Sequence, residues 1–162
     1  MAGSLFFAAR IIFTRRSYAL PKGGEAVARL RGAAALFFPV FFGAALLLFP
    51  DVSAAAEREG LVATVLTSFL EGDSRQAGLF LGALAREVRC RQRPVAPPCI
   101  LIAAGETTVR LEGEAGSGGP SQELALAFAQ QVGDLRGIGI AAIETEGTDG
   151  PTGLAGGLTD CT

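Results

Sequence analysis

CILIAA, at Cys99–Ala104, is a short and wholly apolar run that ends directly at the polar tetrapeptide Gly105-Glu106-Thr107-Thr108. A run of this length, bounded by turn residues, is typical of a strand that is buried on both faces. A second run of this kind, IGIAAI, lies at Ile138–Ile143, and the β-branched stretch LVATVLT at Leu61–Thr67 is a third strand candidate. Strands buried on both faces need helices to cover them, so the sequence around them should supply helices.

Two long helices are predicted between these strands. Asp73 or Ser74 can cap a helix that runs to about Arg91, along which apolar residues recur at helical spacing. A second helix covers residues 120–132, with proline at its first position and glycine just after its end. Strands that alternate with helices imply an α/β fold, here a three-layer, sandwich-like unit with a mostly parallel sheet.

Three further segments are assigned from local pattern. We predict a short Ala-rich helix over Val52–Glu59, with Asp51 as its N-cap and Gly60 as its stop. The alternating segment Thr107–Glu112 suits a more exposed strand. The stretch Glu146–Gly157 is rich in glycine and is predicted to be a loop.

Composition excludes several classes of function. The 162 residues contain no His, which removes Ser-His-Asp and Cys-His catalysis and His-ligated metal sites. The three Cys show no CxxC spacing, which argues against a disulfide framework or a zinc site and indicates reduced thiols in a cytosol-like compartment. All but one of the 14 basic residues are Arg. We interpret this as a bias of GC-rich coding and predict no nucleic-acid partner.

Charge and aromatic residues divide the chain at about residue 50. Residues 1–50 carry a net charge of +5 and hold eight of the 11 Phe, whereas residues 51–162 carry −7. Ala33–Phe49 is a 17-residue apolar run, at the lower limit for crossing a bilayer. Three interpretations of residues 1–50 stay open. The segment is a membrane anchor or targeting sequence through residues 33–49, it includes a buried strand at Val40–Phe49, or it is foreign to the domain behind it.

Three loops at the ends of predicted elements could carry chemistry. Glu106 could hold a cation or a substrate hydroxyl, or it could be a solvated turn carboxylate. The loop Gly113–Gly119 leads into the helix at Pro120, where backbone N–H groups could bind an anion. Its sequence matches neither a Walker A loop nor the GxGxxG motif. The alternative interpretation is a loop that only connects two elements. The loop Glu144–Thr152 (ETEGTDGPT) offers three carboxylates and three hydroxyls that could bind Mg²⁺, or it is an acidic surface loop.

These segments, in this order, resemble the C-terminal region of the glycerate 2-kinase family, whose C-terminal domain is called MOFRL. The similarity covers about residues 51–162 and becomes specific at Pro97-Pro98-Cys99 and at Gly105-Glu106-Thr107-Thr108-Val109. It continues through Gly118-Gly119, Gln122-Glu123-Leu124-Ala125-Leu126 and Gly147-Thr148-Asp149-Gly150-Pro151-Thr152. The resemblance implies a truncated MOFRL-like domain, because the large N-terminal domain and a final stretch of the family have no counterpart in the sequence. Residues 1–50 do not match that N-terminal domain.

The resemblance implies a cytoplasmic transferase that moves the γ-phosphoryl group of ATP to the 2-hydroxyl of D-glycerate with the help of Mg²⁺. It implies catalytic roles for Glu106 and Asp149, cofactor contacts for Gly118, Gly119, Gln122 and Thr148, and metal contacts for Asp149 and Glu146. No oligomeric state follows from the sequence.

Two departures from the family pattern bear on activity. The family usually has Gly-Arg-Gly-Gly-Arg where this chain has Gly116-Ser117-Gly118-Gly119-Pro120, so two guanidinium groups that could clamp an anion are absent. The partner domain that completes the family's cleft is also absent from the sequence. The alternative function is therefore an inactive fragment or diverged copy that acts as a binding module or a membrane-tethered module.

Overall fold

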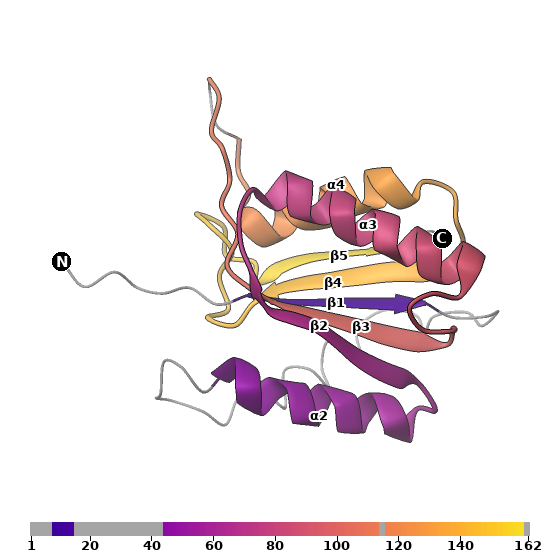
Figure 1. The fold of residues 1–162 in the computed structure, drawn as a ribbon. Helices are drawn as coiled ribbons and strands as arrows, with labels where there is room; N and C mark the ends of the chain where they lie inside the picture. The colour runs from indigo at the N-terminus through magenta and orange to yellow at the C-terminus, as the bar shows by residue number, and fades with distance from the viewer. Residues whose placement is uncertain (1–7, 15–43, 114–115, 161–162) are drawn as a thin grey trace.

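The computed structural model describes residues 8–14, 44–113 and 116–160, which form a five-stranded sheet with helices on both faces (Figure 1). The elements in chain order are β1 (Ala8–Thr14), α2 (Ala44–Arg58), β2 (Val62–Leu70), α3 (Ser74–Arg91), β3 (Cys99–Gly105), α4 (Pro120–Val132), β4 (Ile138–Glu144) and β5 (Gly156–Asp160). Helices α3 and α4 lie on one face of the sheet, and α2 lies on the other (Figure 1). The predicted three-layer α/β architecture is confirmed.

The sheet has the strand order β2-β3-β1-β4-β5. Strands β2 and β3 are parallel, and β1 pairs antiparallel with both β3 and β4, so β2, β3 and β4 all run in one direction. The shared direction of these three strands is the parallel arrangement that the sequence predicts, whereas β1 and β5 run antiparallel to their neighbours, so the sheet is mixed. The sequence pattern does not predict β1, which comes from the first fifty residues. Its Ile11 lies opposite Ile102 on one side and Ala141 on the other.

Strand β3 is buried on both faces, as its continuous apolar run predicts. Cys99, Leu101 and Ala103 join the main core beneath α3 and α4. The intervening residues Ile102 and Ala104 form a smaller cluster with partly buried residues that include one from α2. The largest fully buried side chains are Phe128, Leu81, Leu101, Ile102, Leu124, Ile138, Ile140, Val88 and Val132. Removing this apolar surface from water is the main stabilising contribution to the fold, at about 25 cal/mol per Å².

Helices α3 and α4 begin and end where the sequence predicts. Asp73 caps α3, because its side chain accepts a hydrogen bond of 3.0 Å from the backbone N–H of Gln76. The two helices approach closely at Gly78, where any Cβ atom would collide with the backbone carbonyl of Leu124. Glycine is therefore required at this crossing despite its low helix propensity.

Helix α2 differs from its prediction. It begins at Ala44 rather than at Val52, and Asp51 lies inside the helix instead of capping it. The Ala and Leu residues that precede Asp51 have high helix propensity, and the helix that they begin includes Pro50. The buried strand considered for Val40–Phe49 is therefore wrong at Ala44–Phe49, which is helical.

The membrane interpretation rests largely on residues outside the described ranges. Residues 33–43 of the apolar run Ala33–Phe49 belong to this undescribed part. Within residues 8–14, 44–113 and 116–160, no helix combines the length and the apolar character that crossing a bilayer requires.

The segment after β3 differs from its prediction as well. Thr107–Glu112 forms no strand, although Thr108 makes an isolated bridge to Asp73. The N–H of Thr108 donates to the carbonyl of Gly72 (2.8 Å), and its carbonyl accepts from the N–H of Ser74 (2.9 Å). The backbone of this segment is therefore bonded to the start of α3 rather than to a strand ladder.

The predicted loop Glu146–Gly157 ends in a strand, because β5 begins at Gly156. Gly156 has φ +149°, and a Cβ atom there would collide with the carbonyl oxygen of Ala142 in β4. Glycine has a low strand propensity, so the local sequence indicates a loop. The segment nevertheless forms a strand because it pairs with β4, and β4 lies so close that only glycine fits at position 156.

Candidate functional site

The predicted site residues follow β3 and β4, whose carboxyl ends share one edge of the sheet because the two strands run in the same direction. The structure brings Gly118, Gly119, Gln122 and Asp149 together at the first turn of α4, and these four residues are called the α4 site. Glu106 lies half-buried just after β3. Glu146 and Thr148 are exposed in the loop after β4. Within the described residues, no hydrogen bond joins either side chain to the α4 site.

Asp149 is the centre of this cluster. Its side chain is fully buried, and its two carboxylate oxygens accept hydrogen bonds from the backbone N–H groups of Ser121 (3.0 Å) and Gln122 (2.8 Å). These N–H groups belong to the first turn of α4, where the helix dipole favours negative charge. The chain's own carboxylate therefore occupies the part of the helix terminus that sequence reasoning considered for an anion.

The glycines before α4 pack against the loop that carries Asp149. A Cβ atom at Gly119 would collide with the Asp149 carboxylate, and one at Gly150 would collide with the carbonyl of Gly118. Gly150 also has φ +60°, a conformation that favours glycine. Close backbone packing thus requires glycine at positions 119 and 150, whereas a Cβ atom at Gly118 would meet nothing within 4 Å. A role of the Gly118 and Gly119 amides in anion binding stays a prediction.

Ser121 and Glu144 add a second buried link at the start of α4. The Ser121 hydroxyl donates a hydrogen bond of 2.6 Å to the carboxylate of Glu144, the last residue of β4, and both residues are buried. Sequence reasoning did not single out Ser121. The signals available in the sequence were a hydroxyl residue in the first turn of a predicted helix and a carboxylate at the end of a predicted strand, and their contact is decided by the tertiary structure.

Gln122 links α4 to Thr152, at the end of the acidic loop Glu144–Thr152. Its amide nitrogen donates to the hydroxyl of Thr152 (3.0 Å), and that hydroxyl donates to the backbone carbonyl of Asp149 (2.7 Å). The side chains of Gln122 and Thr152 therefore hold the loop Gly147–Thr152 in place beside α4. Gln122, predicted as a cofactor contact, has a positioning role in this structure.

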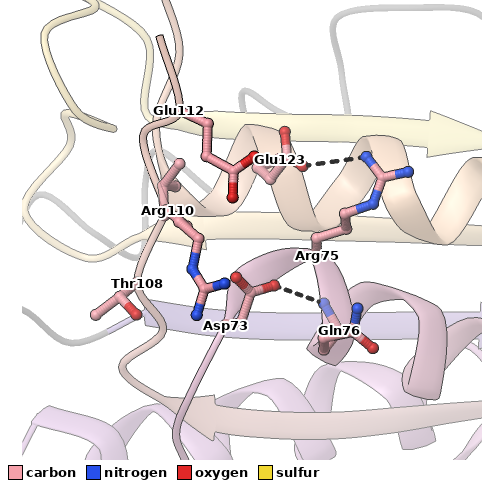
Figure 2. A pocket seen from close by; sticks show the side chains of 8 residues that line it. Asp73, Arg75, Gln76, Thr108, Arg110, Glu112 and Glu123 are labelled. Carbon is pink, nitrogen blue, oxygen red and sulfur yellow. Dashed lines mark hydrogen bonds and ion pairs between the residues drawn. The ribbon is translucent and has the colours of Figure 1, made fainter. Parts of the chain in front are cut away.

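A second feature, an open pocket of about 550 Å³, lies at the first turns of α3 and α4 and the segment that follows β3 (Figure 2). Its lining consists of Asp73, Arg75, Gln76, Thr108, Val109, Arg110, Glu112 and Glu123. Arg75 of α3 and Glu123 of α4 form an ion pair across it, with N–O 3.8 Å. Sequence reasoning missed Arg75 and Arg110, because these residues come from separate stretches that only the tertiary structure brings together.

The described residues do not form a complete metal site by themselves. Among them, no group of three or more His, Cys, Asp or Glu side chains is placed to hold a metal ion. Both oxygens of Asp149 already accept backbone hydrogen bonds, whereas Glu146 is exposed. Mg²⁺ is commonly held by one or two carboxylates together with waters and substrate phosphates, so any contribution of these residues would need further ligands.

Three comparisons with known proteins bear on this site. The model of the MOFRL family matches residues 99–162, which include β3, α4, β4 and the acidic loop. The chain is 46% identical over 111 residues to a protein of Pyrococcus horikoshii named glycerate 2-kinase, covering 68% of this chain and 25% of that protein. It is 38% identical over 110 residues to the D-glycerate 2-kinase of Thermotoga maritima, covering 68% of this chain and 26% of that protein.

Solved structures give the same result at the level of the fold. A crystal structure of a Pyrococcus horikoshii protein matches with a TM-score of 0.65 and 41% identity, covering 70% of this chain and 26% of that one. The crystal structure of a glycerate kinase from Thermotoga maritima matches with a TM-score of 0.67 and 38% identity, covering 69% and 27%. The chain therefore spans about a quarter of the length of these relatives.

Proposed function

Since this chain belongs to the glycerate 2-kinase family, as a diverged member that matches part of the family's length, we propose that it takes part in transferring the γ-phosphoryl group of ATP to the 2-hydroxyl of D-glycerate. The observation that carries this proposal is the match to relatives named glycerate 2-kinase, together with the match of the MOFRL family model to residues 99–162, which include the α4 site. Transfer between two anionic reactants requires donors and cations that are positioned before the reaction.

The α4 site offers such donors in this proposal. The amides of Gly118 and Gly119 bind a nucleotide phosphate, with Gln122 and Thr148 as further nucleotide contacts. Among the described residues, no hydrogen bond uses the N–H groups of these two glycines. Gly119 is buried against the Asp149 carboxylate, whereas Gly118 is half-buried and is the more accessible of the two. Glu106, which follows β3 at the same sheet edge, contacts the substrate hydroxyl or a cation.

Asp149 has a positioning role in the proposal, and Glu146 has a role in binding the metal. Its carboxylate holds the first turn of α4, which fixes the direction of the neighbouring amides. A bound Mg²⁺ would shield the phosphate charges, and Glu146 is the accessible carboxylate beside Asp149 for contact with it.

The proposal is tested by incubating the full chain with ATP, Mg²⁺ and D-glycerate and following phosphate esters by ³¹P NMR. A 2-phosphoglycerate signal that depends on D-glycerate is expected, and the Glu106→Gln variant should lower its rate by about a hundredfold or more. The matched control is Glu57→Gln, which changes an exposed carboxylate on α2, on the opposite face of the sheet. Absence of product at stoichiometric amounts of folded chain would refute the proposal.

A further inference from the structure

The C-terminal ends of α3 and α4 carry a cluster of arginines. The two helices lie side by side and run in the same direction, so both end at the edge of the sheet opposite the loops that follow β3 and β4 (Figure 1). Residues 86–93 and 134–136 hold five Arg and two acidic residues, a net charge of +3 in a chain whose net charge is −2. The five Arg are all exposed and are called the arginine cluster: Arg86, Arg89, Arg91, Arg93 and Arg136.

Two of these guanidinium groups are held in place by the fold. Nη1 of Arg86 donates to the backbone carbonyl of Gln131 (3.0 Å), and Nε of Arg89 donates to the backbone carbonyl of Arg136 (3.2 Å). Within the described residues, each of these side chains uses one N–H group in this way, whereas a guanidinium has five. The remaining donors of both exposed side chains stay available for a ligand.

The acidic residues of the same two stretches leave most of this positive charge uncompensated. Glu87 forms an ion pair with Arg93. Asp134 is exposed in the turn that also carries Arg136, and it forms no ion pair with any described residue. In the described part of the chain, no other member of the arginine cluster forms an ion pair either. The cluster therefore offers several guanidinium groups to an anionic ligand.

The chemistry of the cluster selects a ligand with several phosphate groups. A guanidinium binds phosphate oxygens through paired N–H donors, and a ligand with linked phosphates engages several guanidinium groups at once. Arg86 and Arg89 lie on one face of α3, separated by roughly 4.5 Å along the helix axis. Residues 83–98 and 129–137 contain no aromatic residue on which a nucleic-acid base could stack. A phosphate chain without bases therefore fits the cluster better than a nucleic acid does.

We propose that the arginine cluster binds a linear chain of inorganic phosphate units. Arg86 and Arg89 contact the chain directly, and Arg91 and Arg136 extend the positive surface along it. The proposal is independent of the phosphoryl transfer proposed above, because the cluster and the α4 site lie at opposite edges of the sheet (Figure 1).

Isothermal titration calorimetry of the full chain with long-chain inorganic polyphosphate tests the proposal at low salt. The parent chain should bind, and the double variant Arg86→Gln, Arg89→Gln should weaken binding by about tenfold or more, because charge-assisted hydrogen bonds are lost. The slope of log K against log salt concentration should also become shallower by about 2 in this variant. The matched control is Arg58→Gln on α2, which removes an exposed arginine that likewise donates to a backbone carbonyl and should leave the affinity unchanged.

A second double variant separates binding from folding. The first variant also removes two hydrogen bonds between α3 and the C-terminal end of α4, so circular dichroism must accompany its titration. The double variant Arg91→Gln, Arg136→Gln removes no side-chain hydrogen bond to a described residue. It should melt like the parent chain and still bind polyphosphate more weakly.

Several results would overturn the proposal. These are absence of polyphosphate binding by the parent chain, parent-like affinity in both double variants, and a loss of affinity in Arg58→Gln as large as in the double variants. A uridine oligonucleotide with the same number of phosphates provides the comparison with nucleic acid. Tighter binding of this oligonucleotide than of polyphosphate would also overturn the proposal, because it would show that bases contribute to binding.

Discussion

The capping of α4 by Asp149 yields the sharpest prediction, tested with the isosteric change Asp149→Asn. The carboxylate accepts two backbone N–H groups in a fully buried position. The amide of asparagine can accept only one of them and turns an N–H₂ donor towards the other. One buried donor is then left without an acceptor, and the negative charge at the helix N-terminus is lost.

The magnitude follows from these two effects. An unsatisfied buried donor costs about 1–3 kcal/mol. Loss of a charge at a helix terminus costs about 0.3–1 kcal/mol. The free energy of unfolding should therefore fall by about 1–4 kcal/mol, which corresponds to a decrease in Tm of roughly 3–16 °C for a chain of this length. This is a large share of the stability of a typical domain.

Urea denaturation followed by circular dichroism measures the effect. The matched control is Asp134→Asn, which neutralises an exposed carboxylate just after the end of α4 and should change stability by less than about 0.5 kcal/mol. A loss in Asp149→Asn no greater than in this control would show that the cap does not stabilise the α4 site. An unchanged m-value would confirm that the comparison concerns stability alone.

Three further variants test other parts of the structure. Ser121→Ala should cost about 1–2 kcal/mol in urea denaturation, because the buried Glu144 loses a hydroxyl donor; an unchanged midpoint would contradict this. Gly78→Ala would stabilise an exposed helix by about 0.4–1 kcal/mol. Here it should destabilise the protein by about 1–3 kcal/mol, because the new Cβ atom collides with the Leu124 carbonyl. A raised Tm would count against the close helix crossing. Ile12→Pro should abolish the cooperative thermal transition, because proline removes a backbone donor from a strand paired on both sides; a preserved transition would show that β1 is dispensable.

Local pattern was sufficient for the elements whose signals are strong. CILIAA predicts β3 because a strand covered on both faces must be apolar at every position, and the structure distributes alternate residues to two clusters. Asp73 and Pro120 predict the helix starts because caps act within one turn of the chain. The pattern-based prediction of a loop is wrong at β5, where the close approach of β4 requires glycine in a strand. The prediction of a strand is wrong at Thr107–Glu112, where the backbone of Thr108 is bonded to the start of α3.

Periodicity and short-range capping are enough to predict the α/β class, the main helices and the segments that meet at the α4 site. How those segments contact one another depends on the tertiary fold. It placed the carboxylate of Asp149 on the helix terminus that could have received an external anion. It also inserted β1 between β3 and β4 and gathered Arg75, Arg110 and Glu112 into one pocket. These arrangements depend on contacts between distant parts of the chain, which no local pattern encodes.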